Sequence, residues 1–366
     1  MRVDRARAGR YARAAARWAR LLTSRRQRTG IRVFYGHDRI PAPGEAVAGG
    51  TAKFQRLADR FPNHPTDFTL LYLGSTWLPR DLNPLLGFAA RRSISVVVNQ
   101  SGVAYPGWAG HETEAINRRF RRALLAAHHV LYQSEFCKRS ADEFLGSPRG
   151  TWEVLHNAVD VDHFLPDGAP AADPVLLLAG DQTQAYRLEL ALRTSAHVLG
   201  SEPGAQLLVT GRLASPVEPL VDELGLRGKV ELAGRYAQRE APPLFRRAHL
   251  LLHTKVNDPC PSTVVEAMAC GLPVVYSKSG GTVELVGEDA GIGVSHPVSW
   301  ERDEPPAPEA LAEAVLRLLP QRESYARAAR RRAVDRFALG PWLDRHAELF
   351  KELVAGAPRA RTSRTR

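Results

Sequence analysis

The stretch HTKVNDPCPSTVVEAMACGLPVV, residues 253–275, decides the fold of the second half of the chain. It begins at the end of an apolar run, passes through a loop that contains Asp258, and then changes to a helical pattern. Ser262 is expected to cap a helix over residues 263–270, because a serine hydroxyl can accept a hydrogen bond from first-turn amides. A glycine then stops the helix, and a proline opens the next apolar run. Strand, loop, helix and strand in this order are typical of a doubly wound α/β sheet.

The same alternation covers most of the 366 residues. Runs rich in Val, Leu and Tyr, apolar on both faces, predict parallel strands buried between helices. The first series is expected at residues 31–36, 69–74, 94–98, 129–133 and 152–156. The second series is expected at residues 174–180, 206–211, 229–234, 249–253 and 273–277. The pattern therefore predicts an α/β protein with two Rossmann-like doubly wound domains that face each other across a cleft.

The two series are separated by residues 156–174, which are rich in Pro, Asp and Gly and lack periodicity, as a linker would be. We expect an amino-terminal domain over residues 29–165 and a carboxyl-terminal domain over residues 166–335. A helix over residues 336–356 is expected to pack back toward the amino-terminal domain. The flanking segments are a basic amphipathic or disordered extension, residues 1–28, and a basic tail, residues 357–366.

The net charge of +11 is concentrated at the two ends of the chain. Residues 1–28 contain ten arginines and one aspartate, and residues 355–366 contain four arginines, so the remainder is close to neutral. On a helical wheel one face carries Tyr11, Ala15, Trp18 and Leu22, and another carries Arg10, Arg13, Arg17 and Arg20. An amphipathic helix on an anionic membrane surface has this pattern. A solvated, partly disordered extension is the alternative, and nucleic-acid binding is disfavoured because no aromatic-basic interleaving occurs elsewhere.

Several function classes are excluded by what the sequence lacks. It has no run of eighteen uncharged apolar residues, and its arginine-rich start lacks the apolar core of a secretory signal. Cys137, Cys260 and Cys270 have no metal-type spacing, which fits a reducing cytosol. No GxGxxG follows an expected strand, and neither a P-loop nor a paired metal-ligand motif is present. We therefore expect a cytoplasmic protein, peripheral at the inner membrane face if its extension binds lipid, without a metal or a nucleic-acid partner.

The two acids of the opening stretch suggest a ligand for the loop and helix. Exposed amides at a helix start can receive a diphosphate. Asp258 in the loop could then reach hydroxyl groups beyond the phosphates, and Glu266 in the helix could hold a ribose diol, because a carboxylate accepts from two hydroxyls at once. The alternative is a capped surface helix with two ordinary acids.

The segment EAMACGLPVV, residues 266–275, preceded by an acid eight positions before its glutamate, resembles the donor-site signature of retaining GT-B glycosyltransferases of family four, group 1. Further segments follow in that family's order: AGGTAKFQRLADRF (48–61), SEFCKRSADEF (134–144), HNAVDVDHF (156–164), VTGR (209–212), VELAGRYAQREAPPLFRRAHLLLH (230–253) and SGGTVELV (279–286). The resemblance implies transfer of a sugar from a nucleotide-sugar, UDP- or GDP-linked, with retention of configuration. It implies a glycan, lipid-linked or small-molecule acceptor, and neither a metal nor another cofactor in the donor site.

The resemblance also assigns roles to individual residues. Asp258 takes the place of the family's first glutamate, which holds the donor sugar, and Glu266 takes that of the second, which holds the ribose. The other nucleotide-binding positions carried over are Cys260, Pro261, Ser262, Thr263, Gly180, Arg212, Arg235, Gly49 and Gly50. Pro261 has no N–H, and aspartate is one methylene shorter than glutamate, so this chain departs from the family at the sugar end of the site.

Positively charged side chains are needed beside the leaving diphosphate, because negative charge develops on it as the glycosidic bond breaks. The family pattern has an arginine and, six positions later, a lysine after the first strand of the second domain. Here these positions are Asp181 and Arg187. Lys255 is expected to replace the missing cation, and Arg212 is a further candidate.

Residues 96–111 contain Asn99 and Gln100 where many relatives have a histidine. Amides can orient a sugar or an acceptor but are not general bases at neutral pH. Trp108 and His111 follow in the same segment as further candidates for orienting the acceptor, and Tyr105 and Trp77 could join Trp108 in an aromatic platform.

Two alternatives to a transferase remain open at this point. One is a nucleotide-sugar epimerase or glycan phosphorylase on the same fold. The other is a catalytically weakened nucleotide-sugar-binding protein, which Asp181 and Asn99 would favour because active relatives carry arginine and histidine there.

Overall fold

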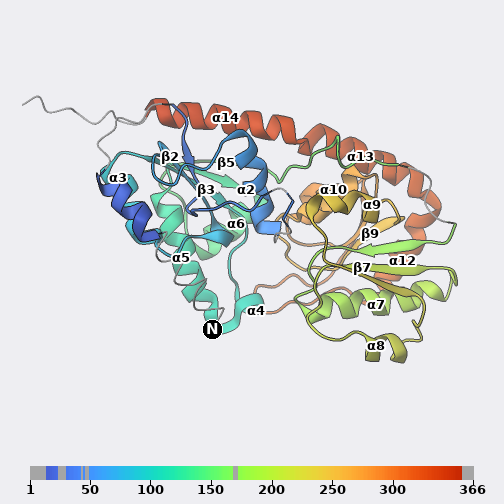
Figure 1. Cartoon of the computed structure of the whole chain (residues 1–366). Coiled ribbons are helices and arrows are strands. Elements are labelled where there is room, and N and C mark those ends of the chain that lie inside the picture. Colours follow the sequence, from blue (N-terminus) through green and yellow to red (C-terminus); the bar gives the residue numbers. More distant parts are fainter. Residues whose placement is uncertain (1–13, 24–29, 43, 46–48, 168–171, 357–366) are drawn as a thin grey trace, which may run out of the picture.

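The computed structural model of the chain describes residues 14–23, 30–42, 44–45, 49–167 and 172–356. Two parallel sheets lie side by side, each surrounded by helices, as Figure 1 shows. The α/β class with two Rossmann-like domains, predicted from the alternating apolar runs, is confirmed.

The amino-terminal sheet has the strand order β1-β2-β3-β4-β5, and every neighbouring pair is parallel. Its strands are β1 (Val33–Phe34), β2 (Leu70–Gly74), β3 (Ser95–Gln100), β4 (His129–Tyr132) and β5 (Thr151–Val154). Its helices are α2 (Gly49–Arg60), α3 (Leu82–Arg91), α4 (Pro106–Ala109), α5 (Thr113–Ala126) and α6 (Glu135–Phe144), with short 3₁₀ turns η1 (Ser75–Trp77) and η2 (Gly110–Glu112). Nearly continuous apolar sequence forms β2 and β3 because both faces of these strands are buried.

The carboxyl-terminal sheet has the order β11-β10-β9-β6-β7-β8, again all parallel. Its strands are β6 (Val175–Leu178), β7 (Gln206–Thr210), β8 (Val230–Gly234), β9 (Leu250–His253), β10 (Val274–Ser277) and β11 (Gly291–Val294). Its helices are α7 (Ala185–Leu199), α8 (Glu218–Glu223), α9 (Ala241–Phe245), α10 (Ser262–Ala269), α11 (Thr282–Val286) and α12 (Pro308–Leu318), with η3 (Gln238–Glu240) and η4 (Leu319–Gln321). Each predicted strand segment overlaps a strand. The edge strand β11 was not predicted, because its sequence GIGV is short and half glycine.

Two long helices follow the second sheet. Helix α13 (Arg322–Phe337) packs against α10, and α14 (Leu339–Gly356) runs along the amino-terminal domain, where Figure 1 shows it in red. Trp342 and Phe350 of α14 belong to the same buried cluster as Tyr35 and Tyr72 of the first domain. The carboxyl-terminal helix therefore ties the end of the chain to the first sheet.

Residues 14–23 form a helix that docks on the amino-terminal domain. Leu21 is fully buried in the domain core, and Arg17 forms ion pairs with Asp38 at 2.6 Å and with Asp81. Trp18 Nε1 donates to Asp81 at 2.8 Å. The predicted division into an apolar and an arginine face is thus wrong for this segment: Arg17 is buried by its two acids, and Leu22 points to solvent. The rest of the 1–28 extension, with Arg10, Tyr11 and Arg13, lies outside the described residues.

Across the described ranges, no helix combines the length and apolarity needed to cross a membrane.

Candidate donor site

Helix α10 begins one residue earlier than expected. It spans Ser262–Ala269, and its N-cap is Pro261, whose extended backbone (φ −68°, ψ 115°) gives no side-chain hydrogen bond to the first turn. The prediction that Ser262 caps the helix is therefore wrong. Because no side chain caps the start of α10, its first amides are available to a ligand, as a helix N-terminus that binds anions requires.

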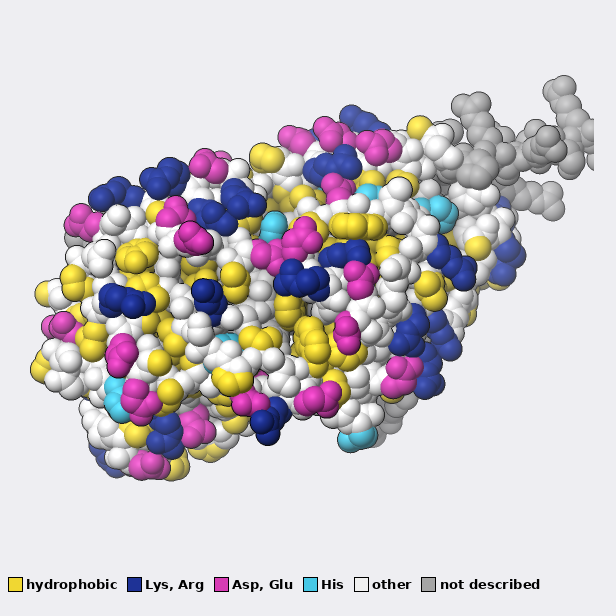
Figure 2. Space-filling view, turned by 180° about the vertical axis from the view of Figure 1, so that it is seen from behind, with side chains coloured by type: hydrophobic (Ala, Val, Ile, Leu, Met, Phe, Trp, Pro, Cys, Tyr) yellow, Lys and Arg dark blue, Asp and Glu magenta, His cyan; other side chains and the backbone are white. Residues whose placement is uncertain are grey.

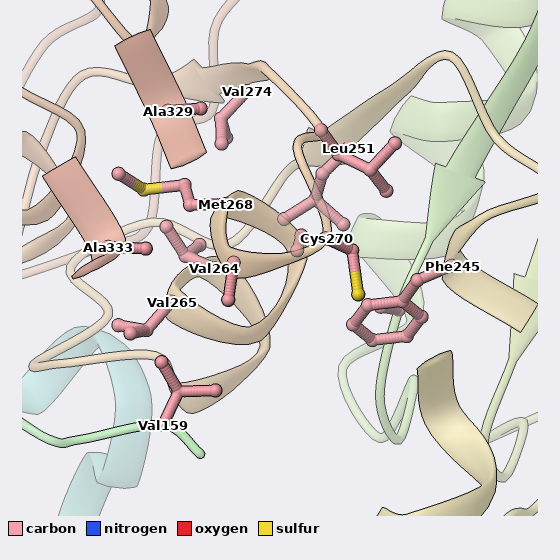
Figure 3. Packing of buried hydrophobic residues seen from close by; sticks show 14 of the residues in the cluster. Val159, Phe245, Leu251, Val264, Val265, Met268, Cys270, Val274, Ala329 and Ala333 are labelled. Atoms are coloured by element: carbon pink, nitrogen blue, oxygen red, sulfur yellow. The ribbon is translucent and has the colours of Figure 1, made fainter. Parts of the chain in front are cut away.

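Packing against α13 fixes the orientation of α10. Figure 3 shows Val264, Val265 and Met268 of α10 in the same buried cluster as Ala329 and Ala333 of α13. Since this side of α10 is committed to the core, the side chain of its one acid is free to face the first domain.

Glu266 meets an arginine of the first domain. It accepts hydrogen bonds from Arg56 Nη2 of α2 at 3.0 Å and from Gln238 Nε2 of η3 at 2.5 Å. Glu266 is only 4% exposed. Burial raises its pKa despite the opposing charge of Arg56, and burial lowers the pKa of Arg56. The ribose acid predicted from sequence thus lies at the contact between the two domains.

Asp258 lies in the loop after β9, among three cationic or polar neighbours. Its Oδ2 is 3.3 Å from Lys255 Nζ and 3.4 Å from His253 Nε2. Burial alone would raise the pKa of Asp258, but Lys255, His253 and Arg187 outweigh it and hold that pKa far below its usual value. Asp258 is therefore an ionised carboxylate at neutral pH, able to accept hydrogen bonds from hydroxyl groups.

Asp181 forms an ion pair with Arg212. The Asp181 carboxylate accepts from Arg212 Nε at 3.0 Å and from the Arg212 backbone N–H at 2.9 Å. Burial would raise the pKa of Asp181, but Arg212 and Arg235 lower it. Arg187, nearly buried, donates from Nη1 to the Asp181 carbonyl at 2.9 Å. The strand ends β6, β7 and β8 therefore gather their charged residues in one place.

The charges at this edge of the sheet leave an excess of positive charge. Four cations, Arg187, Arg212, Arg235 and Lys255, interact with three acids, Asp181, Asp258 and Asp303. The net positive charge suits an anionic diphosphate. Gly180, with φ +84°, brings the loop after β6 against the start of α10, since a Cβ there would lie 3.5 Å from Thr263 Cγ2.

The glycine pair, Gly49 and Gly50, forms the first turn of α2 and does not precede the helix as expected. A Cβ on Gly50 would lie 2.6 Å from Thr76 Oγ1. The absence of a side chain thus lets α2 begin directly against η1, on the helix that presents Arg56 to Glu266.

A chain of buried hydrogen bonds links α2 to the donor loop. Lys53 Nζ and Gln133 Nε2 each donate to Asn99 Oδ1 at 2.6 Å. Asn157 Nδ2 lies 3.2 Å from Gln133 Oε1 and donates to the Cys260 carbonyl at 2.7 Å. Lys53 is 4% exposed, and among the described residues its ammonium group donates to the Asn99 side chain. Burial lowers the pKa of Lys53 to about 8, which the nearby Cys260 and Cys137 oppose.

Residues expected to orient the sugar or acceptor lie in two separate places. Asn99 and Gln100 are buried and use their side chains internally: Gln100 Nε2 donates to the Gly102 carbonyl at 2.8 Å. Trp108 is half exposed on α4, and His111 is exposed on η2. The Tyr105 and Trp108 rings lie 6.4 Å apart, whereas Trp77 stacks on His37 at 3.7 Å. Trp77 therefore packs within the first domain and not with the other two aromatics.

Five residues of this site were not singled out from sequence: Lys53, Arg56, Gln133, Asn157 and Gln238. A signal existed for two of them. Lys53 and Arg56 follow the glycine pair and are three residues apart, so they share a face of α2. In the described part of the chain, no three His, Cys, Asp or Glu side chains are grouped to hold a metal.

Lys53 makes stability depend on pH. Its pKa is about 8 in the folded protein against 10.5 when unperturbed, so the unfolded chain binds the proton more tightly and stability rises as pH rises through 8. The free energy of unfolding of the wild type should gain roughly 2 kcal/mol over Lys53→Met between pH 7 and pH 9.5. Urea unfolding of both proteins across this range measures it. If the difference in free energy of unfolding between the two proteins stays constant with pH, the lowered pKa of buried Lys53 is contradicted.

The sequence of this chain is similar to those of known glycosyltransferases. The family model described as Glycosyl transferases group 1 matches residues 166–333. The gpi3 subunit of phosphatidylinositol N-acetylglucosaminyltransferase from Schizosaccharomyces pombe is 22% identical over 49% of this chain and 40% of its own length. D-inositol 3-phosphate glycosyltransferase of Mycobacterium bovis is 30% identical over 35% of this chain and 29% of its own length. The matches thus span less than half of these curated relatives.

Solved structures share the two-domain architecture. Sucrose-phosphate synthase from Thermosynechococcus elongatus superposes with a TM-score of 0.65 at 18% identity, covering 82% of this chain and 76% of its own. Anabaena HepE in complex with UDP and glucose gives a TM-score of 0.64 at 18% identity, covering 78% of each chain. At these identities the likeness concerns the fold, which is GT-B. Residues 166–333 thus match the model of the glycosyl transferases group 1 family, within a chain that has the GT-B fold.

Proposed function

We propose that this protein is a retaining glycosyltransferase that moves a sugar from a nucleotide-sugar to a glycan, lipid-linked or small-molecule acceptor. The observation that carries the proposal is the pair of carboxylates, Glu266 and Asp258, on either side of the uncapped start of α10. The start of α10 can bind an anion, with one acid in the loop before it and one acid further along the helix. This arrangement suits a ligand with hydroxyl groups on both sides of a diphosphate.

The donor is proposed to lie along this loop and helix. Its diphosphate would meet the amides from Cys260 to Thr263, in the field of Arg187, Arg212, Arg235 and Lys255. Its ribose hydroxyls would replace Arg56 as hydrogen-bond donors to the Glu266 carboxylate. The hydroxyls of its sugar would donate to Asp258. Pro261 offers no N–H, so the remaining amides and the cations hold the diphosphate.

In the proposed reaction the bond between the anomeric carbon and the phosphate oxygen breaks, and the acceptor oxygen bonds to that carbon from the same face. The acceptor proton passes to the departing diphosphate, so no enzyme base is required. Arg187 and Lys255 stabilise the negative charge that develops on the leaving group. Trp108 and His111, exposed on α4 and η2, are proposed to contact the acceptor.

A uridine diphosphate sugar is the proposed donor, and the support comes from Anabaena HepE, whose structure contains UDP and glucose. A GDP-sugar is the alternative. The three cysteines are unpaired and buried, which supports a reducing, cytoplasmic site of action.

A panel of nucleotide-sugars tests the function. A UDP-sugar should raise the unfolding temperature by mass action and be turned over with a suitable acceptor. Glu266→Gln should weaken nucleotide binding by roughly 1.5–3 kcal/mol, because charge-assisted hydrogen bonds to ribose are lost. Glu288→Ala, at an exposed acid of the same domain, is the control. Nucleotide binding without any transfer would favour the binding-protein alternative, and free sugar or isomerised donor would favour hydrolysis or epimerisation.

Arg187→Ala should lower kcat by roughly a hundredfold and change KM little, since its positive charge acts mainly on the transition state. Arg193→Ala, on the exposed side of the same helix, is the matched control. Steady-state kinetics with the donor identified above provides the measurement. Equal kcat values in the two variants would remove Arg187 from the phosphate site.

A further inference from the structure

A concave site lies on the carboxyl-terminal domain, at the end of α10 that is remote from the donor loop. It is a pocket of about 470 Å³ whose lining includes Cys270 and Gly271, where α10 ends. Five arginines line it: Arg246, Arg322, Arg327, Arg330 and Arg331. Asp167 is the single acid among its described lining residues. A ligand here would not occupy the donor cleft, because the two sites are at opposite ends of one helix.

Two of the five arginines have structural roles. Arg330 donates to the carbonyls of Phe164 and Ala269, each at 2.8 Å, and so closes the carboxyl end of α10. Arg322 Nε donates to the His249 carbonyl at 3.1 Å, which leaves its two terminal nitrogens for other partners.

The other arginines are available to a ligand. Within the described ranges, the guanidinium groups of Arg246 and Arg331 have no hydrogen bond and no ion pair. Arg327 has one long contact, 3.6 Å, to the exposed Glu323. Figure 2 shows Lys and Arg side chains among acidic ones at the end of the molecule that carries α13. An anion in the pocket would relieve the mutual repulsion of these guanidinium groups.

The chemistry of the lining indicates the class of ligand. Guanidinium groups bind phosphate oxygens in a bidentate manner, and several of them around one concavity suit a group with more than one negative charge. Ala248, Leu272 and Ala326 add an apolar surface, and the volume lies in the range of small-molecule sites. We propose that this pocket is a second ligand site that binds a phosphorylated small molecule, independent of the donor cleft.

Calorimetric titration with inorganic pyrophosphate tests the site in the full-length chain. The pocket variant is Arg246→Glu with Arg331→Glu, and the control is Arg317→Glu with Arg336→Glu, two exposed arginines outside the pocket with the same change of charge. The wild type and the control should bind one more equivalent of pyrophosphate than the pocket variant. Equal stoichiometry in all three proteins would overturn the proposal, whatever the donor cleft binds.

Folding is checked by thermal unfolding. If the double variant does not fold, Arg331→Ala at its exposed position should still weaken pyrophosphate binding at least fivefold, and unchanged binding would overturn the proposal. Vesicles of phosphatidylcholine with phosphatidylinositol 4-phosphate separate a lipid headgroup from a free phosphate. Binding to these vesicles without binding of soluble pyrophosphate would also overturn it.

Discussion

The ion pair between Arg56 and Glu266 is a buried charge contact that joins the two domains at the candidate donor site. Its side chains are only 10% and 5% exposed, so it differs from surface pairs, which contribute little to stability. Separating the pair in place would leave two buried charges uncompensated, a change that costs about 3–5 kcal/mol in other proteins. A ribose that takes Glu266 must therefore compensate Arg56 or let it reach water. Under the proposed function, donor binding and the contact between the domains are one equilibrium.

Around this pair, two helices bring the residues of the candidate donor site together. Helix α2 carries Lys53 and Arg56 from the first domain, and α10 carries Glu266 from the second. The buried hydrogen bonds from Lys53 through Asn99 to the Cys260 carbonyl tie the same two elements beside the donor loop. Burial lowers the pKa of Lys53 to about 8, because the neutral amide of Asn99 offsets the desolvation of its ammonium group only partly. The candidate donor site thus contains one buried cation, Arg56, that is paired with an acid and another, Lys53, that is not.

Much of the fold could be predicted from sequence, because strands buried on both faces are continuous apolar runs. The strand β11 could not, since two glycines in four residues remove that signal. Glu266 and Asp258 were predictable because they lie on one contiguous loop and helix. The contact between Arg56 and Glu266 was not, because a separation of 210 residues in the sequence contains no information about which side chains meet. Helical periodicity likewise could not anticipate that Asp38 and Asp81 would bury Arg17 and turn its helix inward.

The most direct test of this account is a crystal structure with uridine diphosphate bound. The account predicts ribose hydroxyls within hydrogen-bond distance of the Glu266 carboxylate, phosphate oxygens on the first amides of α10, and Arg56 displaced from Glu266. A nucleotide bound elsewhere, with the Arg56–Glu266 pair intact at its present 3.0 Å, would contradict it.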